Sequence, residues 1–451
     1  MAAETSKTTQ ESLSLAAEQL VVTDVAAAAV VDKETQQPKP EEEKPVEAET
    51  EVSKPSGGDE IPESGSFKEE SNIVADLPDA ENKALQEFKL LVQTALNHHE
   101  FSVPPPPPQE GSDASPEEVS IWGIPLLADE RSDVILLKFL RARDFKVKEA
   151  FAMIKSTILW RKEFGIDGLL EEDLGDDLEK AVYMHGSDKE GHPVCYNIYG
   201  EIYKKMFSDE EKRHKILRWR IQFLEKITRR LDFTPAGIST IVQVNDLKNS
   251  PGPAKWELRQ ATKHALQLLQ DNNPEFVAKR VFINVPWWYL AVIRMIRPFL
   301  TRRTKSKFVF AGPSKSAETL LRYIAAEQLP VKYGGLSKDG EFGVNDAVTE
   351  ITVRPAAKHT VEFPVTENGL LCWELRVIGW DVSYGAEFVP SAEGSYTVII
   401  QKARKVASSE EPVLCNNYKI GEPGKVVLTV DNQSSKKKKL LYRLKTKPTS
   451  D

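Results

Sequence analysis

The segment that decides the fold is VPWWYLAVIRMIRPFLTRRTKSK at residues 285–307. Drawn at about 100° per residue, the part from Trp287 to Phe299 is apolar on nearly every side, and Arg294 and Arg297 share one narrow stripe. Such a segment is either a helix buried in a large core or an element that touches a membrane. The local pattern favours the buried helix, so the surrounding sequence must decide between the two.

Strand-like and helix-like segments alternate around this run. The strand-like segments are GISTIVQVND (237–246), RVFINV (280–285) and KFVFAG (307–312), and the helix-like ones are AKWELRQATKHALQLLQ (254–270) and SAETLLRYIAAEQ (316–328). This alternation predicts a mostly parallel sheet with helices packed on it. Upstream, two helical runs lie between Asp129 and Gly165.

After Lys338 the hydrophobic period changes to two. In LLCWELRVIGW (370–380), polar residues alternate with four apolar ones, Leu371, Trp373, Leu375 and Val377. The runs YTVIIQ, KVVLTV and LLYRLK repeat the pattern with turn residues between them. This alternation predicts an antiparallel β-sandwich as a second domain.

Charge is unevenly divided along the 451 residues. The net charge is −8, yet residues 1–78 hold 18 acidic residues against 6 lysines and no arginine, and the rest of the chain is mildly basic. The acidic segment has too little apolar area to offset the entropy of ordering, which predicts a disordered tail. A basic folded part suits an anionic partner.

Several classes of protein find no support in the sequence. No apolar run reaches the roughly 18 residues that span a bilayer, and MAAETSKTTQ at the N-terminus lacks the features of a secretory signal, so we expect a cytoplasmic protein. Three scattered cysteines without a CxxC pair predict reduced, mostly buried thiols. Basic residues do not alternate with aromatic ones as in nucleic-acid readers, so no nucleic-acid partner is expected.

An enzyme is also unsupported. The sequence has no GxSxG elbow, no GxxxxGK[ST] loop, no GxGxxG after a strand and no HExxH. His185 and His192 flank GSDKEG, a hairpin turn, and we interpret them as surface or packing residues. We therefore expect neither catalytic residues nor a metal or cofactor.

Several segments together resemble the CRAL-TRIO lipid-transfer proteins. They are VILLKFLRARDFKVKEAFAMIKSTILWRKEFG, YMHGSDKEGHPVCYNIYGE, VNDLKN, IRPFLTRRTKSKFVFAG and AAEQLPVKYGG, in order between about residues 80 and 336. The sandwich, with WELRVIGWDVSYGAEFVPSAEGSYTVIIQKARK and NQSSKKKKLLYRLKTK, resembles a GOLD domain. With the acidic tail, the whole arrangement is similar to the plant patellins.

The resemblance implies a fold class and four regions. The expected fold is an α/β CRAL-TRIO domain with a mixed, mostly parallel sheet and a gated lipid cavity, followed by an all-β GOLD sandwich. The regions are a disordered tail at 1–78, a helical region at 79–165 with a proline-rich spacer at 104–116, a lipid-binding domain at 166–337 and the sandwich at 338–451.

The resemblance also gives the opening segment a role as the gate of a lipid cavity. The gate helix, with its membrane contacts, would comprise Trp287, Trp288, Tyr289, Leu290, Ile293, Arg294 and Arg297. Its inner side would line the acyl-chain pocket, and the three aromatic residues would settle at the membrane interface. Each buried acyl methylene is worth about 0.8 kcal/mol, so a lipid needs an enclosing cavity rather than an open groove.

The family's phosphatidylinositol head-group positions are occupied here by Arg143, Glu275, Thr304 and Lys307. Arginine and lysine can pair with phosphate oxygens, threonine adds a hydroxyl donor, and glutamate accepts from inositol hydroxyls. Phosphatidylinositol or a phosphoinositide is therefore the expected cargo. The basic residue that follows the arginine in the family prototype is Asp144 here, which weakens the phosphate corner or changes its geometry.

The prototype's phosphatidylcholine contacts are replaced in this chain. Two tyrosines, a serine and a threonine of the prototype correspond to Met184, Cys195, Ile241 and Gln243. Exchange of a choline lipid should therefore be lost or altered. The identity of a second ligand stays open.

Two basic patches suggest docking to anionic membranes. The first lies beside the gate helix and contains Arg302, Arg303 and Lys305. The second is the run Lys436, Lys437, Lys438 and Lys439 near a hairpin loop. For the second patch, a solubilising sheet edge that discourages aggregation is an equally good interpretation.

These features predict a phosphoinositide-binding carrier that transfers or presents a phospholipid between membranes. The alternative is a phosphoinositide-sensing scaffold that recruits trafficking proteins through its GOLD domain without net transfer. The resemblance to patellins implies a cytoplasmic, peripheral protein of the plasma membrane, endomembranes or cell plate, acting in trafficking and cytokinesis. We expect the acidic tail to restrain docking on anionic bilayers.

Overall fold

The computed structural model describes residues 70–102, 116–206, 210–250, 268, 271–297, 302–366, 369–379, 381–406 and 412–448. The acidic tail up to residue 69 and nearly all of the proline-rich spacer lie outside these residues. Contacts divide the chain into two compact units, Met1–Met184 with His192–Ser314 and His185–Gly191 with Lys315–Asp451. Residues 315–337, expected to belong with the lipid-binding domain, thus group with the sandwich.

A helical lobe opens the first unit. Its helices are α2 (Asp79–Asn97), α3 (Glu130–Arg141), α4 (Val147–Phe164) and the short α5 (Ile166–Leu169), with the 3₁₀ turn η1 (Val74–Asp76) ahead of them and the two-residue strands β1 (Ser120–Ile121) and β2 (Ile124–Pro125) between α2 and α3. Asp129 caps α3 by accepting from the Arg131 backbone N–H at 2.9 Å, and Gly165 ends α4 in the left-handed region. The apolar sides of α2, α3 and α4 form one core.

The folded chain begins earlier than the sequence predicted. Arg141 is 8% exposed, and its guanidinium donates to the Asn72 side chain at 2.6 Å and the Ser71 carbonyl at 2.5 Å. It also forms an ion pair with Glu70 at 3.0 Å. The expected end of the disordered tail at residue 78 is therefore wrong, because a largely buried arginine on α3 needs these acceptors.

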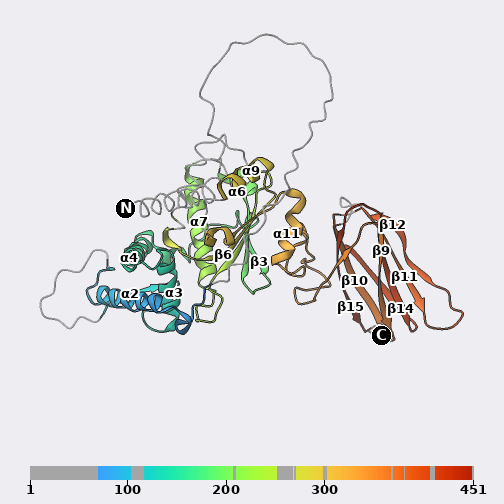
Figure 1. Ribbon diagram of the computed structural model, residues 1–451, viewed down its shortest axis with the longest axis horizontal. Coiled ribbons are helices and arrows are strands. Elements are labelled where there is room, and N and C mark those ends of the chain that lie inside the picture. The colour runs from blue at the N-terminus through green and yellow to red at the C-terminus, as the bar shows by residue number, and fades with distance from the viewer. Residues whose placement is uncertain are drawn as a thin grey trace, which may run out of the picture. The chain divides into compact units, whose positions relative to one another are not determined.

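A five-stranded sheet follows, in the order β3-β4-β5-β6-β7. The strands are β3 (Val182–Ser187), β4 (Pro193–Ile198), β5 (Ile241–Asp246), β6 (Val277–Ile283) and β7 (Phe308–Phe310). The pairs β4-β5, β5-β6 and β6-β7 are parallel, which confirms the predicted mostly parallel sheet. The accompanying helices are α6 (Tyr199–Met206), α7 (Glu210–Thr228), α9 (Trp287–Ile296) and α10 (Arg302–Lys307) (Figure 1).

The second unit contains α11 (Ser316–Tyr323), the 3₁₀ turns η3 (Pro313–Lys315, which straddles the division) and η4 (Val331–Tyr333), and two four-stranded antiparallel sheets. One sheet has the order β13-β10-β15-β8 and the other β12-β11-β14-β9. The strands are β8 (Thr349–Val353), β9 (Ala357–Val365), β10 (Gly369–Ile378), β11 (Val382–Pro390), β12 (Val398–Val406), β13 (Leu414–Ile420), β14 (Gly424–Asn432) and β15 (Lys438–Lys447). Side chains from both sheets form one core, as in the predicted sandwich.

The outward side of β10 explains why residues 329–337 belong to this unit. Glu374 is only 3% exposed and pairs with Arg443 at 2.9 Å. Arg443 also donates to the Leu336 carbonyl at 2.8 Å, and Arg376 donates to the carbonyls of Val331 at 2.6 Å and Gly335 at 3.0 Å. The polar residues that alternate with the sandwich core therefore hold the preceding segment against the sheet.

Candidate functional site

The chain brings together two of the predicted head-group residues, Glu275 and Lys307. Glu275 precedes β6 and Lys307 directly precedes β7, and these strands are parallel neighbours, so both residues lie at the same edge of the sheet. The Lys307 Nζ lies 2.6 Å from the Glu275 Oε2, and the two side chains are 26% and 22% exposed. The sequence separation of 32 residues thus becomes a half-buried ion pair.

Lys138, which the sequence analysis did not identify, binds the backbone of Glu275. Its side chain is 2% exposed and donates to the carbonyls of Ser239 at 2.9 Å and Glu275 at 3.0 Å. The ammonium also lies 5.0 Å from the centre of the Phe276 ring, a favourable cation–π arrangement. A lysine inside the apolar helical run VILLKFL was the available signal, because such a charge is buried only when it has partners.

Arg143 lies in the turn that follows α3. Its side chain is half-buried and donates to the Ala142 carbonyl at 2.9 Å. The next residues, Asp144 and Phe145, adopt left-handed φ values of 48° and 59°, and Asp144 is exposed. Thr304 lies in α10, but its side chain is outside the described part of the structure.

Helix α9, the predicted gate helix, has a buried side and an exposed side, although both are largely apolar. Tyr289, Leu290 and Ile293 are at most 2% exposed and belong to a cluster with Phe282 and Phe310. The opposite side carries the exposed residues Trp287, at 76%, Ala291, Arg294 and Met295, at 69%. The local pattern could not distinguish the sides because both are largely apolar.

One of the predicted membrane contacts, Tyr289, is covered in this conformation. Tyr289 points inward, and its ring lies edge-on to Phe310 with 6.3 Å between centroids. Trp288 is partly buried and packs edge-on against Tyr289 at 5.7 Å. Arg297 is half-buried at the end of the helix. Of the three aromatic residues, Trp287 alone is exposed enough to contact a membrane in this conformation.

One surface of the five-stranded sheet, called the inner face below, is defined by two rungs of the strand register. The first rung is Cys195, Gln243, Arg280 and Phe308, and the second is Asn197, Asn245, Phe282 and Phe310. Cys195 belongs to an apolar cluster with residues of α7, and the two phenylalanines of the second rung, Phe282 and Phe310, belong to the α9 cluster. The inner face therefore connects these two helices.

The positions expected to replace choline-lipid contacts lie at this face. Cys195 and Gln243 are register partners, and Met184 and Ile241 join the Cys195 cluster. Burial raises the pKa of the Cys195 thiol to about 11, so it is a neutral packing group. The four positions, separated by up to 59 residues in the sequence, thus lie in one region of the fold.

The four-lysine patch is smaller than the sequence predicted. Lys436 and Lys437 are exposed in the turn between β14 and β15, but Lys438 is 9% exposed and its ammonium contacts the Gly379 carbonyl. Lys439 pairs with Glu350 at 3.0 Å. Lys438 is therefore wrong as a docking residue, because strand alternation directs it away from solvent.

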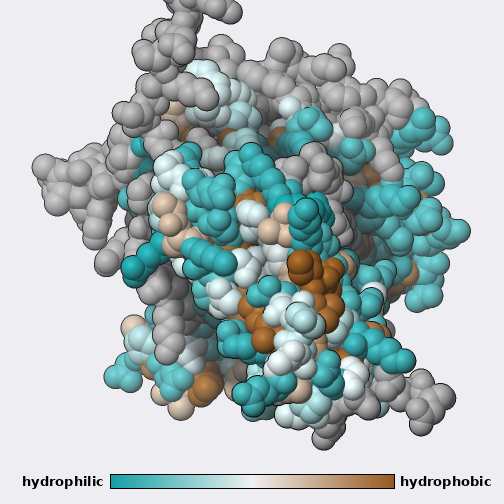
Figure 2. All heavy atoms as spheres, turned by 90° about the vertical axis from the view of Figure 1, so that its right-hand side faces the viewer, coloured by the Kyte–Doolittle hydropathy of each residue, from teal (hydrophilic) through white to brown (hydrophobic). Residues whose placement is uncertain are grey.

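The patch beside the gate helix is described in part. Lys305 is half-buried in α10, and the side chains of Arg302 and Arg303 lie outside the described residues. Figure 2 views the side of the molecule on which Figure 1 draws the sandwich, and this face is largely hydrophilic with some apolar patches. Among the helices in the described ranges, none is long and apolar enough to cross a membrane.

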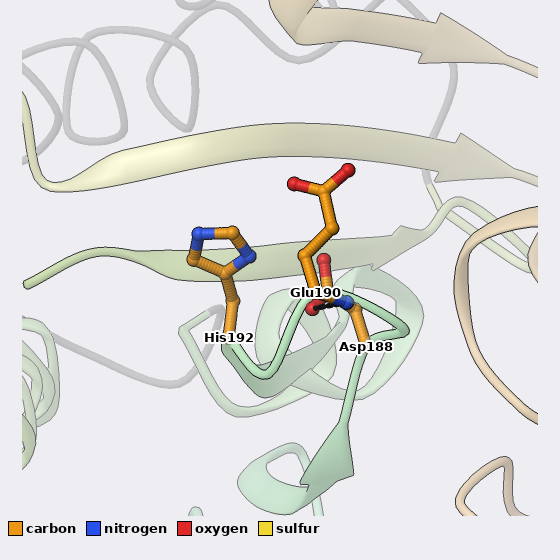
Figure 3. A group of neighbouring side chains, drawn as sticks. All are labelled: Asp188, Glu190 and His192. Carbon is orange, nitrogen blue, oxygen red and sulfur yellow. Dashed lines mark hydrogen bonds between the residues drawn. The ribbon is translucent and has the colours of Figure 1, made fainter. Parts of the chain in front are cut away.

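A small cluster of metal-ligand types lies in the β3–β4 turn, where Asp188, Glu190 and His192 approach within 4.8 Å (Figure 3). The Asp188 Oδ1 accepts from the Glu190 backbone N–H at 3.0 Å, which is the arrangement of an Asx turn. His192 is buried and Glu190 exposed. The turn is sufficient to bring the three side chains together. His192 is buried, as expected of a packing residue.

Three family models match the chain. They are described as CRAL/TRIO, N-terminal domain, at residues 84–156; CRAL/TRIO domain, at residues 178–335; and Patellin-1-like, C-terminal GOLD domain, at residues 354–438. The second match contains the Glu275–Lys307 pair, α9 and the inner face. The third contains most of the sandwich.

Curated relatives extend over most of the chain. Patellin-3 of Arabidopsis thaliana is 60% identical over 394 residues, which cover 85% of this chain and 78% of that protein. Patellin-5 of the same plant is 58% identical over 86% of this chain, although the match spans only 57% of Patellin-5. The SEC14 cytosolic factor of Eremothecium gossypii is 33% identical over 46% of this chain and 71% of that protein.

Proposed function

Because the chain belongs to the patellin family, with a CRAL-TRIO domain followed by a GOLD domain, we propose that it encloses a phosphoinositide and transfers or presents it between membranes. Family membership supports the general role of a lipid carrier. The choice of an inositol lipid and the site of action on the plasma membrane, endomembranes or cell plate are our additions.

The observation that carries the proposal is the two-sided helix α9. Its inner residues Tyr289, Leu290 and Ile293 close over the phenylalanines of the inner face, and its outer side exposes Trp287 and Met295. A helix that only completed a core would have a polar outer side. Apolar residues on both sides suit an element that covers a lipid in one state and meets a bilayer in another.

Partial exposure within the sheet supports an interior with room for a ligand. Gln243 and Arg280 lie on the central strands β5 and β6, yet both are only half-buried. The Tyr199 side chain also keeps accessible surface, although burial raises the pKa of its hydroxyl. Side chains that are surrounded by protein but still accessible are expected along the wall of a cavity.

The Glu275–Lys307 pair suits the head group of an inositol lipid. Without ligand each charge satisfies the other at 2.6 Å. A bound head group would offer phosphate oxygens to Lys307 and hydroxyl donors to Glu275, so both charges keep partners in the loaded state. Lys138 would hold the Glu275 backbone in place through its hydrogen bond to the carbonyl.

A lipid-transfer assay between vesicles tests the assignment. Lys307→Ala and Glu275→Gln should each lower phosphatidylinositol transfer by about tenfold, the loss expected for one charge-assisted hydrogen bond. Lys315→Ala is the matched control, because it removes a lysine from a more exposed pair with Glu318 at 2.8 Å. Undiminished transfer in both head-group variants would contradict the proposed site.

The scaffold alternative has an observation of its own. Strand β12 lies at the edge of its sheet, and Ile399 on it is 68% exposed beside Tyr396 at 90%. An apolar edge strand is a ready template for a partner strand. If the protein binds phosphoinositide vesicles but moves no more than one lipid per protein molecule, the scaffold function replaces the carrier function.

A further inference from the structure

Three polar side chains form a connected chain across α7 and the inner face. The Arg220 Nη2 of α7 donates to the Asn197 Oδ1 of β4 at 2.7 Å. The Asn197 Nδ2 in turn donates to the Asn245 Oδ1 of β5 at 3.0 Å. Because arginine has no acceptor, it fixes the orientation of both amides along the chain.

Both ends of this chain are hydrogen-bond donors that have no acceptor. The Arg220 Nη1 and the Asn245 Nδ2 are buried, and neither atom has a hydrogen-bond partner in the described part of the protein. A guanidinium is charged at every physiological pH, and buried polar atoms are almost always satisfied in folded proteins. The missing complement is therefore an acceptor, and a negatively charged oxygen is the acceptor that also balances the arginine.

A second guanidinium brings more positive charge to the same face. Arg280 shares the first rung with Gln243, and its guanidinium lies 5.5 Å from the centre of the Phe308 ring. Burial raises the pKa of the Tyr199 hydroxyl, and the positive charges of Arg220 and Arg280 both oppose this rise. Both guanidinium groups therefore lie near Tyr199. Stacked rings of Phe282, Phe308 and Phe310 continue the wall beside them.

This cluster is distinct from the proposed head-group site. Arg280 lies five residues after Glu275, about 16 Å along the strand, whereas Lys307 directly precedes Phe308, the register partner of Arg280. Asn197 and Asn245 lie one rung farther in the same direction. A group bound here would be inside the domain rather than at the edge of the sheet.

We propose that Arg220, Asn197, Asn245 and Arg280 form an interior subsite that binds the anionic oxygens of a second class of ligand, a single-chain amphiphile with a carboxylate or phosphate head. Its hydrocarbon chain would lie along the phenylalanine wall beneath α9. The inference rests on the proposed lipid-carrying interior. The two unpartnered donors are enclosed in this conformation, so the ligand reaches them when the side chains that cover them move.

Three probes with the same hydrocarbon chain test the subsite in the full-length protein. They are oleate, oleoyl lysophosphatidate and the neutral oleyl alcohol, with dissociation constants measured by titration below the concentration at which the probes form micelles. We expect at least one anion to bind about tenfold more tightly than the alcohol, as one charge-assisted hydrogen bond provides. The stronger anion identifies the source of the charge.

Variants assign the preference to the named residues. Arg220→Gln should bring the anion-to-alcohol ratio close to one and leave the affinity for the alcohol nearly unchanged. Arg218→Gln is the matched control, because Arg218 lies on the same helix but pairs with Glu172. Equal binding of all three probes by the parent protein, or an unchanged ratio in Arg220→Gln, would overturn the subsite.

A parallel measurement separates this inference from the proposed function. Phosphatidylinositol transfer is measured for the same variants, and Arg220→Gln should retain it while Lys307→Ala loses it. A protein that prefers the anions but transfers no inositol lipid would keep the subsite and refute the carrier function. A protein that transfers inositol lipid but binds the anions no better than the alcohol would refute the subsite alone.

Discussion

The polar network around Trp373 and Glu374 in the sandwich and the network at the inner face of the sheet differ in how completely their buried groups are paired. In the sandwich the Trp373 Nε1 donates to the Tyr384 hydroxyl at 2.9 Å, and the nearly buried Glu374 meets both Arg443 and Lys338. At the inner face, Arg220 and Asn245 each keep one buried donor without a partner among the described residues.

This difference is the one we expect between a core that only has to be stable and an interior that is completed by a ligand. A buried donor without a partner costs about 1–3 kcal/mol, so a fold gains nothing from keeping one. In the sandwich, every part of the Trp373 and Glu374 network is complete within the chain itself. At the inner face, the described residues leave the network open, which fits a site completed by a ligand.

The largest expected effect is the loss of the buried pair in the sandwich. Glu374→Gln keeps the shape of the side chain but leaves Arg443, at 1% side-chain exposure, without its counter-charge. Breaking such a pair costs about 3–5 kcal/mol. Native-state hydrogen exchange of the β10 and β15 amides measures the loss where it occurs.

An exposed pair on the same domain provides the control for this change. Glu362 and Lys425 lie 3.0 Å apart with side chains 53% and 43% exposed, so Glu362→Gln should cost less than about 1 kcal/mol. Equal losses for the two variants would show that the sandwich does not depend on its buried pairing.

Next in size is the effect of Trp287, on the outer side of the gate helix. Trp287→Ala should weaken binding to anionic phosphoinositide vesicles by about tenfold, since the indole loses apolar contact with the bilayer. Its free energy of unfolding should change by less than about 0.5 kcal/mol, as for other exposed positions. Vesicle pelleting and chemical denaturation measure the two quantities.

Tyr396→Ala is the matched change on the other unit, because Tyr396 is 90% exposed. If Tyr396→Ala weakens vesicle binding and Trp287→Ala does not, the membrane contact belongs to the sandwich and not to the helix over the inner face.

A smaller effect is expected when the open network loses its arginine. Arg220→Met removes a partly buried charge whose acceptor among the described residues is the Asn197 oxygen. In lipid-free protein, relief of the unpaired donor should offset the lost bond, so the free energy of unfolding should change by less than about 1 kcal/mol. If Arg220→Met lowered the free energy of unfolding as much as Glu374→Gln, Arg220 would be needed for stability. The contrast between the two regions would then disappear.

The smallest effect concerns His185, which bonds the Ser337 hydroxyl at 2.8 Å. Burial lowers the pKa of His185, and Asp339 opposes the shift only in part. A histidine with a lowered pKa binds fewer protons when folded, so it favours folding above its ordinary pKa of about 6.5 and loses this contribution as the pH falls toward the lowered value. His185→Gln should flatten the pH dependence of stability below about pH 6.5 in denaturation curves, and an unchanged slope would show that His185 does not contribute.

Local sequence patterns were sufficient to predict the large-scale architecture. Alternation of period two around Trp373 depends on the backbone alone, since successive side chains of a strand point to opposite faces. The ordered motifs from VILLKFLRARD to LPVKYGG placed the lipid-binding domain and indicated Glu275 and Lys307. Patterns of this kind are determined by residues a few positions apart, so they do not depend on which elements pack against the segment.

Only the tertiary structure decided which polar groups meet and which side of α9 is covered. Tyr289 and Trp287 are equally apolar in sequence, and their sides differ because Phe310 lies under one of them. Asn197 donates to Asn245, which is 48 residues away in the sequence. Arg220 of α7 in turn donates to Asn197. Such contacts depend on strand order and helix placement, which bring distant residues within the few ångströms over which hydrogen bonds act.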